Sequence, residues 1–186
     1  MDDARRSFDI DAIRADFPIL ERSIHGKPLD YLDSAGSAQK PKQVLDALLS
    51  AYQDTYSNVH RGLHFLSEAS TDLYEAVRGK VAHFIGAESG DEIVLTAGAT
   101  MSLNLIAQSW ALPRLQAGDE ILLSIADHHA NIVPWQMVAE KTGAVVRAFP
   151  MDADGSFNMA SFTDMMTPRT RIVAVPHVSN VLGTVF

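Results

Sequence analysis

Short apolar runs separated by helical stretches occupy the second half of the chain. The runs are rich in aliphatic side chains and are bounded by polar or turn-forming residues, which predicts β-strands. The four predicted strands are 92–96, 120–124, 144–149 and 171–176. Helices are predicted between them, including 130–142 and 160–166, from the spacing of their apolar residues. This alternation is typical of a parallel sheet covered on both faces, so the predicted fold class is α/β.

The first half of the chain is predicted to be mainly helical. Apolar residues recur there at helical spacing in three stretches, and Pro18 ends the first of them. The predicted helices are 8–17, 42–56 and 73–84. A short strand is predicted within "PLDYLDSAG" (28–36), and the polar stretch "SNVHRGLHF" (57–65) is predicted to be a loop.

Composition and charge exclude several classes of protein. The net charge of -8 argues against a nucleic-acid or anionic-membrane surface, because both need a basic patch. No apolar run is long enough to span a membrane, and the acidic start Met1–Ala4 does not resemble a signal peptide. The sequence contains no cysteine, which excludes disulfides, thiolate zinc sites and a cysteine nucleophile within these residues. The expectation is a soluble cytoplasmic protein without nucleic-acid or membrane partners.

Three polar clusters follow predicted strands, and they are the candidate chemistry of the chain. They are Gly98-Ala99-Thr100, His128-His129-Asn131 and His177-Ser179-Asn180. In open α/β sheets, ligands bind outside the carboxyl ends of the strands. Because each cluster follows a predicted strand, the three clusters together predict a ligand site at that edge of the sheet.

Each cluster is open to two interpretations from its residues alone. Gly98 and Thr100 at a helix start are suited to a phosphate, but they also fit a plain turn with a threonine N-cap. One ring of the pair His128-His129 could stack on a planar ligand, which fits better than a shared metal, because adjacent side chains point in different directions. Asn180 holds either a turn or a ligand.

A metal site is not predicted. The other close histidine pair, His60 and His64, has the spacing of two ligands on one helix face, but Gly62 between them disfavours a helix. The sequence also lacks cysteine ligands and an HExxH motif.

Taken together, the clusters resemble the cysteine desulfurases of iron–sulfur cluster assembly, of the Suf kind, within the class V aminotransferase group of pyridoxal 5'-phosphate (PLP) enzymes. The resemblance rests on "YLDSAGSAQKP", "VHRGLHFLS", "GAT" before an aliphatic helix, "DHHANIVPWQ" and "HVSNVLGT", in that order. It implies the large domain of a fold-type-I PLP-dependent transferase, with a mostly parallel sheet. The implied domains are an N-terminal helical segment, 1–28, and the N-terminal part of the PLP-binding large domain, 29–186.

The resemblance also assigns roles to individual residues. It implies that His128 stacks on the pyridine ring of PLP, and that Ala99 (through its backbone) and Thr100 hold the phosphate. It implies that Asn180 reaches the ring hydroxyl and the substrate carboxylate. His60 and Arg61 are implied, less directly, near the site mouth and a dimer contact.

The family reaction converts L-cysteine to L-alanine and passes the sulfur on as a persulfide. The resemblance implies a homodimer and a sulfur-acceptor protein as partners. The chain departs from the family at Met101, Asp127 and Gly36, where Glu, Glu and Ala are commoner. Alternative members of the group are a selenocysteine lyase or an aminotransferase, and a non-catalytic remnant is the alternative from a different class.

The main departure concerns the residues that carry the reaction. Neither the lysine that attaches the cofactor covalently nor the cysteine that takes the sulfur has a counterpart in the sequence, and Lys80 and Lys141 are wrongly placed to substitute. Where the family continues into Asn-Pro, the sequence reads Val185-Phe186. The expectation is a truncated chain that is inactive by itself.

Overall fold

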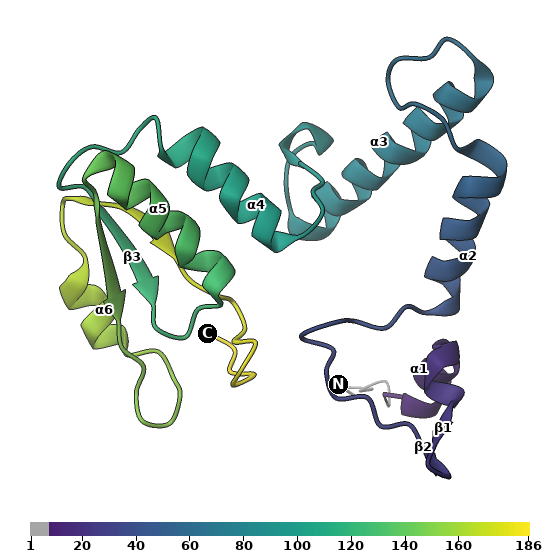
Figure 1. Ribbon diagram of the computed structural model, residues 1–186, viewed down its shortest axis with the longest axis horizontal. Helices are drawn as coiled ribbons and strands as arrows, with labels where there is room; N and C mark the ends of the chain where they lie inside the picture. Colours follow the sequence, from purple (N-terminus) through teal and green to yellow (C-terminus); the bar gives the residue numbers. More distant parts are fainter. Residues whose placement is uncertain (1–7) are drawn as a thin grey trace, which may run out of the picture. The chain divides into compact units, whose positions relative to one another are not determined.

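A computed structural model describes residues 8–186 of the protein, so the acidic start Met1–Ala4 lies outside the described residues. The chain divides into two compact units, Met1–Val94 and Leu95–Phe186 (Figure 1). The sequence-based division after residue 28 is a different boundary, and it stays a prediction.

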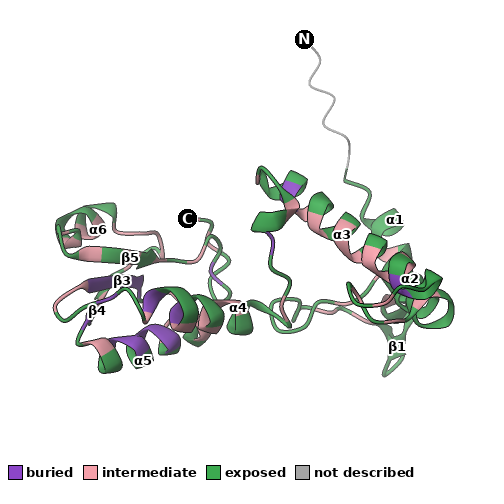
Figure 2. Ribbon diagram, turned by 90° about the horizontal axis from the view of Figure 1, so that it is seen from above, coloured by how far each residue is buried: buried purple, intermediate pink, exposed green. Residues whose placement is uncertain are grey.

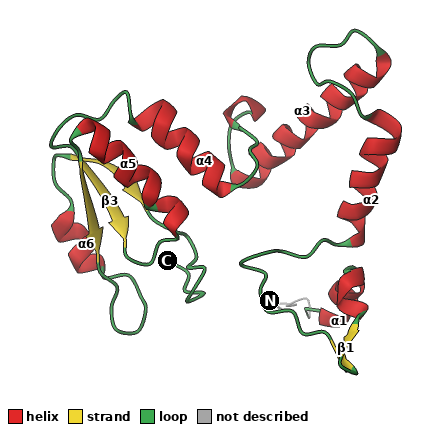
Figure 3. Cartoon of the chain, in the orientation of Figure 1, coloured by secondary structure: helices red, strands yellow, loops and turns green. Residues whose placement is uncertain are grey.

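The first unit is built mainly of helices (Figure 3). Two-residue strands form its one hairpin among the described residues, in place of the strand predicted within 28–36. The hairpin turns through His25 and Gly26, which both have positive φ. The elements are α1 (Ile10–Ala15), η1 (Pro18–Glu21), β1 (Ser23–Ile24), β2 (Lys27–Pro28), α2 (Lys42–Ser50), η2 (Ala51–Thr55), α3 (Phe65–Ile85) and η3 (Gly90–Glu92).

Helix α3 begins eight residues earlier than the periodicity predicts, at 65 rather than 73. Ser67 explains the difference, because its hydroxyl ties the first turn of α3 to the preceding loop. The hydroxyl donates to the Asn58 carbonyl oxygen at 2.6 Å and accepts from the Gly62 amide at 2.9 Å. These bonds fold the polar loop back against the helix start, which apolar spacing alone does not reveal.

The first unit buries little apolar surface by itself. Among its described residues, the only buried hydrophobic side chains are Ala82 and Ile93. The apolar stripe of α2 is largely exposed instead, with Leu45 at 44%, Leu48 at 57% and Leu49 at 57%. Contiguous exposed apolar residues of this kind are typical of surfaces that bind another chain or segment.

The second unit is a three-stranded parallel sheet with helices on both faces. The strand order is β4-β3-β5, and the register pairs Ile121 with Val146 and with Ile172. The predicted α/β fold class is confirmed. Its elements are α4 (Ala99–Ile106), η4 (Ala107–Ala111), β3 (Glu120–Ser124), η5 (His129–Asn131), α5 (Val133–Thr142), β4 (Val145–Phe149), α6 (Met159–Met165) and β5 (Thr170–Ala174).

The core of the second unit forms on both faces of β3, whose five residues are all buried (Figure 2). On one face, Ile121 packs with Trp135 and Val138 of α5. On the other face, Phe149 of β4 meets Phe162 of α6, with ring centroids 5.3 Å apart. A strand covered on both faces needs a continuous apolar run rather than an alternating one, which is the pattern of 121–123.

The predicted strand at 92–96 is wrong. The residues there follow η3 in an unpaired extended stretch, and Val94 is 67% exposed. The Ile93 amide donates to the Gly90 carbonyl oxygen at 3.0 Å, and the Ile93 carbonyl oxygen accepts from Arg78 Nε at 3.1 Å. Because these groups bond within the first unit, Ile93 joins no sheet in the described chain.

Glu120 is a buried carboxylate at the amino end of β3, where its side chain is 5% exposed. Its Oε2 accepts from Thr167 Oγ1 at 2.8 Å and from Arg147 Nη1 at 3.1 Å, and Oε1 accepts from Arg169 Nη2 at 3.1 Å. The Thr167 hydroxyl, and then the two guanidinium groups, favour the charged form and hold the pKa of Glu120 below its usual value. The network joins β3 to β4 and to the turn before β5.

We expect Glu120→Gln to destabilise the second unit at neutral pH and to flatten its acid dependence. A carboxyl with a depressed folded-state pKa stabilises the fold above its unfolded pKa of about 4.3, and the contribution is lost as the pH falls through the folded value. Urea unfolding at about pH 7 and about pH 3 measures both effects. Asp46→Asn is the control, because its carboxylate forms an exposed pair with Lys42. A Glu120→Gln chain with the wild-type acid dependence would refute this role.

Candidate functional site

Residues from all three predicted clusters line one pocket of about 430 Å³ in the second unit. Ala99, His128 and Asn180 line it, together with Asp127 and Asn131. The predicted residue Thr100 follows Ala99 in the first turn of α4 and is not among the lining residues. The structure therefore brings together three of the four residues predicted to bind the cofactor.

The start of α4 offers unpaired backbone N–H groups. Within the described chain, the amides of Ala99, Thr100 and Met101 have no hydrogen-bond acceptor, and the first helical bond runs from the Ser102 amide to the Gly98 carbonyl oxygen at 3.1 Å. No side chain caps the helix, so the predicted threonine N-cap is not formed. Free amides at a helix start, aligned with its dipole, suit an anion such as a phosphate.

Gly98 and Thr96 shape the turn into α4. Gly98 has φ 153° and ψ 173°, a backbone region that is essentially restricted to glycine. Thr96 Oγ1 donates to the Gly98 carbonyl oxygen at 3.0 Å and lies 2.7 Å from Ser102 Oγ. The threonine that matters for this turn therefore precedes the glycine, whereas the sequence pointed to the one that follows it.

We expect Gly98→Ala to cost about 1–3 kcal/mol of stability through backbone strain. Space is not the cause, because no atom lies within 4 Å of the added Cβ. Gly79→Ala is the control: it is also open, lies inside α3 and has no positive φ, so it should stabilise by about 0.5–1 kcal/mol. Urea unfolding of both variants measures the difference. Equal effects would show that the Gly98 backbone is not restrictive.

The two adjacent histidines have different environments. Their ring planes are 81° apart with centroids at 6.3 Å, and of the two only His128 lines the pocket. His128 Nδ1 accepts from the Ala130 amide at 3.1 Å, so the neutral ring carries its proton on Nε2. Its side chain acts as the N-cap of η5 as well as lining the pocket.

Asp127 and Asn131 line the pocket, although Asn131 was predicted only as a member of its cluster and Asp127 only as a departure from the family. Asp127 Oδ1 accepts from Asn131 Nδ2 at 2.9 Å, and Asp127 Oδ2 accepts from the Ser124 amide at 3.1 Å. Burial raises the pKa of the Asp127 carboxyl, although both hydrogen bonds oppose the shift. The signal in the sequence that could have indicated this pair was the spacing of four residues between Asp127 and Asn131, on either side of the two histidines.

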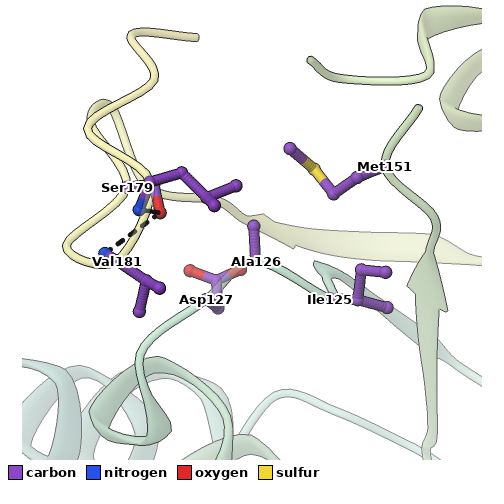
Figure 4. A pocket seen from close by; sticks show the side chains of 7 residues that line it. Ile125, Ala126, Asp127, Met151, Ser179 and Val181 are labelled. Carbon is purple, nitrogen blue, oxygen red and sulfur yellow. Dashed lines mark hydrogen bonds between the residues drawn. The ribbon is translucent and has the colours of Figure 1, made fainter. Parts of the chain in front are cut away.

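Asn180 lies in a turn that folds back after β5. An isolated bridge joins Val178 to Val185, and the buried Ser179 hydroxyl accepts from the amides of Val181 and Leu182 at 3.3 and 3.1 Å. A second pocket of about 280 Å³ lies beside this turn and shares Asp127 with the first (Figure 4). The Ser179 side chain holds the turn, which leaves the exposed Asn180 beside the first pocket.

His60 and Arg61 belong to the first unit. His60 Nε2 lies 3.2 Å from Glu75 Oε1, and its ring meets Tyr74 edge-on with centroids 5.6 Å apart. Arg61 is exposed. Their predicted place near a site mouth and a dimer contact stays a prediction.

Two further properties concern the described residues as a whole. Within 8–186, no group of three or more His, Cys, Asp or Glu side chains is arranged to hold a metal ion. None of the helices in this part of the chain is both long enough and apolar enough to cross a membrane.

The fold and the pocket define an α/β protein with an anion-suited helix start and an imidazole beside it, at the carboxyl edge of a parallel sheet. Residues 30–186 match the aminotransferase class-V family. The chain belongs to this family.

Curated relatives carry the name that the sequence motifs suggested. The chain is 54% identical over 176 residues to a probable cysteine desulfurase of Vibrio cholerae, covering 95% of this chain and 44% of the relative. It is 48% identical over 178 residues to a cysteine desulfurase of Salmonella newport, covering 96% of this chain and 44% of the relative. The chain thus spans less than half the length of these relatives.

Solved structures agree with the relatives. The cysteine desulfurase CsdA of Escherichia coli has a TM-score of 0.78 at 43% identity, over 94% of this chain and 43% of that one. An apo cysteine desulfurase of Thermococcus onnurineus NA1 has a TM-score of 0.85 at 34% identity, over 95% and 42%. A C-DES structure with glycine covalently linked to its PLP cofactor has a TM-score of 0.74 at 22% identity, over 93% of this chain and 43% of that one, and it shares the fold alone.

Proposed function

We propose that the chain carries part of the PLP site of a cysteine desulfurase. The observation that carries this proposal is the pocket in which Ala99, His128 and Asn180 meet. The start of α4, the turn after β3 and the turn after β5 supply these residues, and the family match covers all of them. No specific observation favours a selenocysteine lyase, an aminotransferase or a non-catalytic remnant over this function.

The residues present fit the chemical groups of PLP. The free amides of Ala99 and Thr100 suit the phosphate. His128 can stack on the pyridine ring, since its Nδ1 is already held by the turn. Asn180 can donate to the ring hydroxyl oxygen or to a substrate carboxylate through its amide. When bound, PLP supplies an electron sink for bond cleavage at the substrate, while the protein positions both.

Covalent attachment and sulfur transfer need residues that these 186 do not supply. No lysine lines the pocket. Lys141 is the only lysine of the second unit and lies in the last turn of α5. The sequence also has no cysteine to take sulfur as a persulfide. We therefore expect this chain to bind the cofactor noncovalently and, alone, not to convert L-cysteine to L-alanine.

The proposed setting is that of the named relatives. A cysteine desulfurase passes sulfur to an acceptor protein, and the resemblance to the Suf kind supports iron–sulfur cluster assembly in the cytoplasm as its purpose. Family homodimerisation is the proposed use of the exposed apolar stripe on α2.

We expect His128→Ala to weaken binding of pyridoxamine 5'-phosphate by up to about tenfold, since ring stacking is worth about 0.5–1.5 kcal/mol. This ligand lacks the aldehyde of PLP and so cannot react with lysine. His129→Ala is the matched control and should change affinity less than about twofold, because this side chain is outside the pocket. Isothermal titration calorimetry measures both. Equal losses would contradict the stacking role of His128.

We expect the chain to self-associate through α2, because Leu45, Leu48 and Leu49 form an exposed apolar stripe. Light scattering on a size-exclusion column should give a mass above that of the 20.3 kDa monomer. Leu49→Ser should shift the chain toward the monomer, whereas Gln53→Ser, at an exposed polar position of the following turn, should not. A wild-type chain that elutes as a monomer at micromolar concentration would refute the proposed homodimer for these residues.

A further inference from the structure

Three side chains form a hydrogen-bonded relay beneath the pocket. Trp135 Nε1 donates to Asn131 Oδ1 at 2.9 Å, and Asn131 Nδ2 donates to Asp127 Oδ1 at 2.9 Å. Asp127 Oδ2 in turn accepts from the Ser124 amide at the end of β3. We refer to Trp135, Asn131 and Asp127 as the relay. It runs from the core of the second unit to the pocket wall.

The chemistry of its members gives the relay a single direction. An indole N–H can only donate, and an ionised carboxylate can only accept. The Asn131 amide has one group of each kind, so only one orientation of the amide satisfies both neighbours. In the reverse orientation, the Asn131 NH₂ group would meet the indole N–H, a donor against a donor, and the Asn131 oxygen would meet the Asp127 carboxylate, an acceptor against an acceptor. Because Trp135 is 3% exposed, water is poorly placed to repair a mismatch there.

Part of the relay spans the turn that contains His128. Its Asp127–Asn131 bond joins the residue before His128 to the residue three positions after it. Inside that span, the backbone N–H of Ala130 donates to His128 Nδ1 at 3.1 Å, and the backbone N–H of Asn131 donates to the His128 carbonyl oxygen at 2.8 Å. The imidazole and the backbone of His128 are therefore held by the same turn that the relay ties to the core.

Core packing alone does not account for this arrangement. Trp135 packs with Val138 and Ala139, and a phenylalanine ring would fill much of the same space. Packing explains why position 135 is large and apolar. It does not explain why the indole N–H meets the oxygen of an amide whose nitrogen holds a pocket carboxylate.

We propose that the relay positions His128, keeping its imidazole in one tautomer and one orientation at the pocket. Asp127, Asn131 and Trp135 act through His128 as positioning residues. The identity of the pocket's ligand rests on the proposed function, but the hold on His128 does not. The relay makes the histidine a preformed platform, so that a ring binding there does not have to order it.

The first measurement needs no ligand. In a chain with ¹⁵N-labelled histidines, the His128 signals are assigned by their loss in His128→Ala. In the wild type with a neutral imidazole, Nδ1 should give the shift of an unprotonated nitrogen and Nε2 that of an N–H. Asn131→Ala should give averaged shifts from mixed tautomers, because the turn loses its clamp. Val138→Ala is the control, because Val138 is fully buried, lies on α5 with Trp135 and belongs to the same core cluster as Trp135, but is not in the relay.

The second measurement is pyridoxamine 5'-phosphate affinity. Trp135→Phe removes the N–H and keeps an aromatic ring, so it should weaken binding about 2- to 10-fold, the value of one hydrogen bond. Val138→Ala should leave affinity near the wild-type value even if its melting temperature falls. Wild-type tautomer shifts in Asn131→Ala, or equal mixing in Val138→Ala, would overturn the relay. A wild type that binds no pyridoxamine 5'-phosphate, with tautomers still mixed in Asn131→Ala, would uphold the relay and refute the proposed function.

Discussion

Burial of strand β3 between two covering layers is the constraint on which the second unit depends. All five residues of β3 are buried, so each of their backbone polar groups needs a partner within the protein. Parallel pairing with β4 on one side and β5 on the other supplies the ladder partners. Because all three strands run in the same direction, their carboxyl ends lie at one edge. The pocket is a consequence of that alignment.

Strand β3 has a different hydrogen-bond network at each of its two ends. At the amino end, the Glu120 carboxylate accepts hydrogen bonds from β4 and from the turn before β5, so it joins β3 to both. At the carboxyl end, the Ser124 amide donates to Asp127, which bonds Asn131 beside His128. The first network joins the strands of the sheet, whereas the second shapes the turn that lines the pocket.

The first unit poses a different problem, because its helices have clear apolar stripes and few buried side chains. Helix α2 is amphipathic by sequence, but its apolar stripe is exposed in the described chain. An exposed stripe gains hydrophobic free energy only when something covers it, at about 25 cal/mol per Å² of buried apolar surface. The proposed homodimer would cover the α2 stripe and so add to the stability of this unit.

The sequence by itself determined the fold class, the presence of the main helices and the clusters of polar residues that meet at the pocket, but not where α3 begins. These follow from local rules: apolar spacing sets element type, and parallel strands bring their carboxyl ends together. The motifs also pointed to the family, which the match over residues 30–186 confirmed. Only the tertiary structure decided that 92–96 is no strand, because Ile93 bonds to Gly90 and Arg78 instead. The pocket roles of Asp127 and Asn131 were decided in the same way, since a hydrogen bond depends on where an amide and a carboxylate meet in space, which no spacing of residue types specifies.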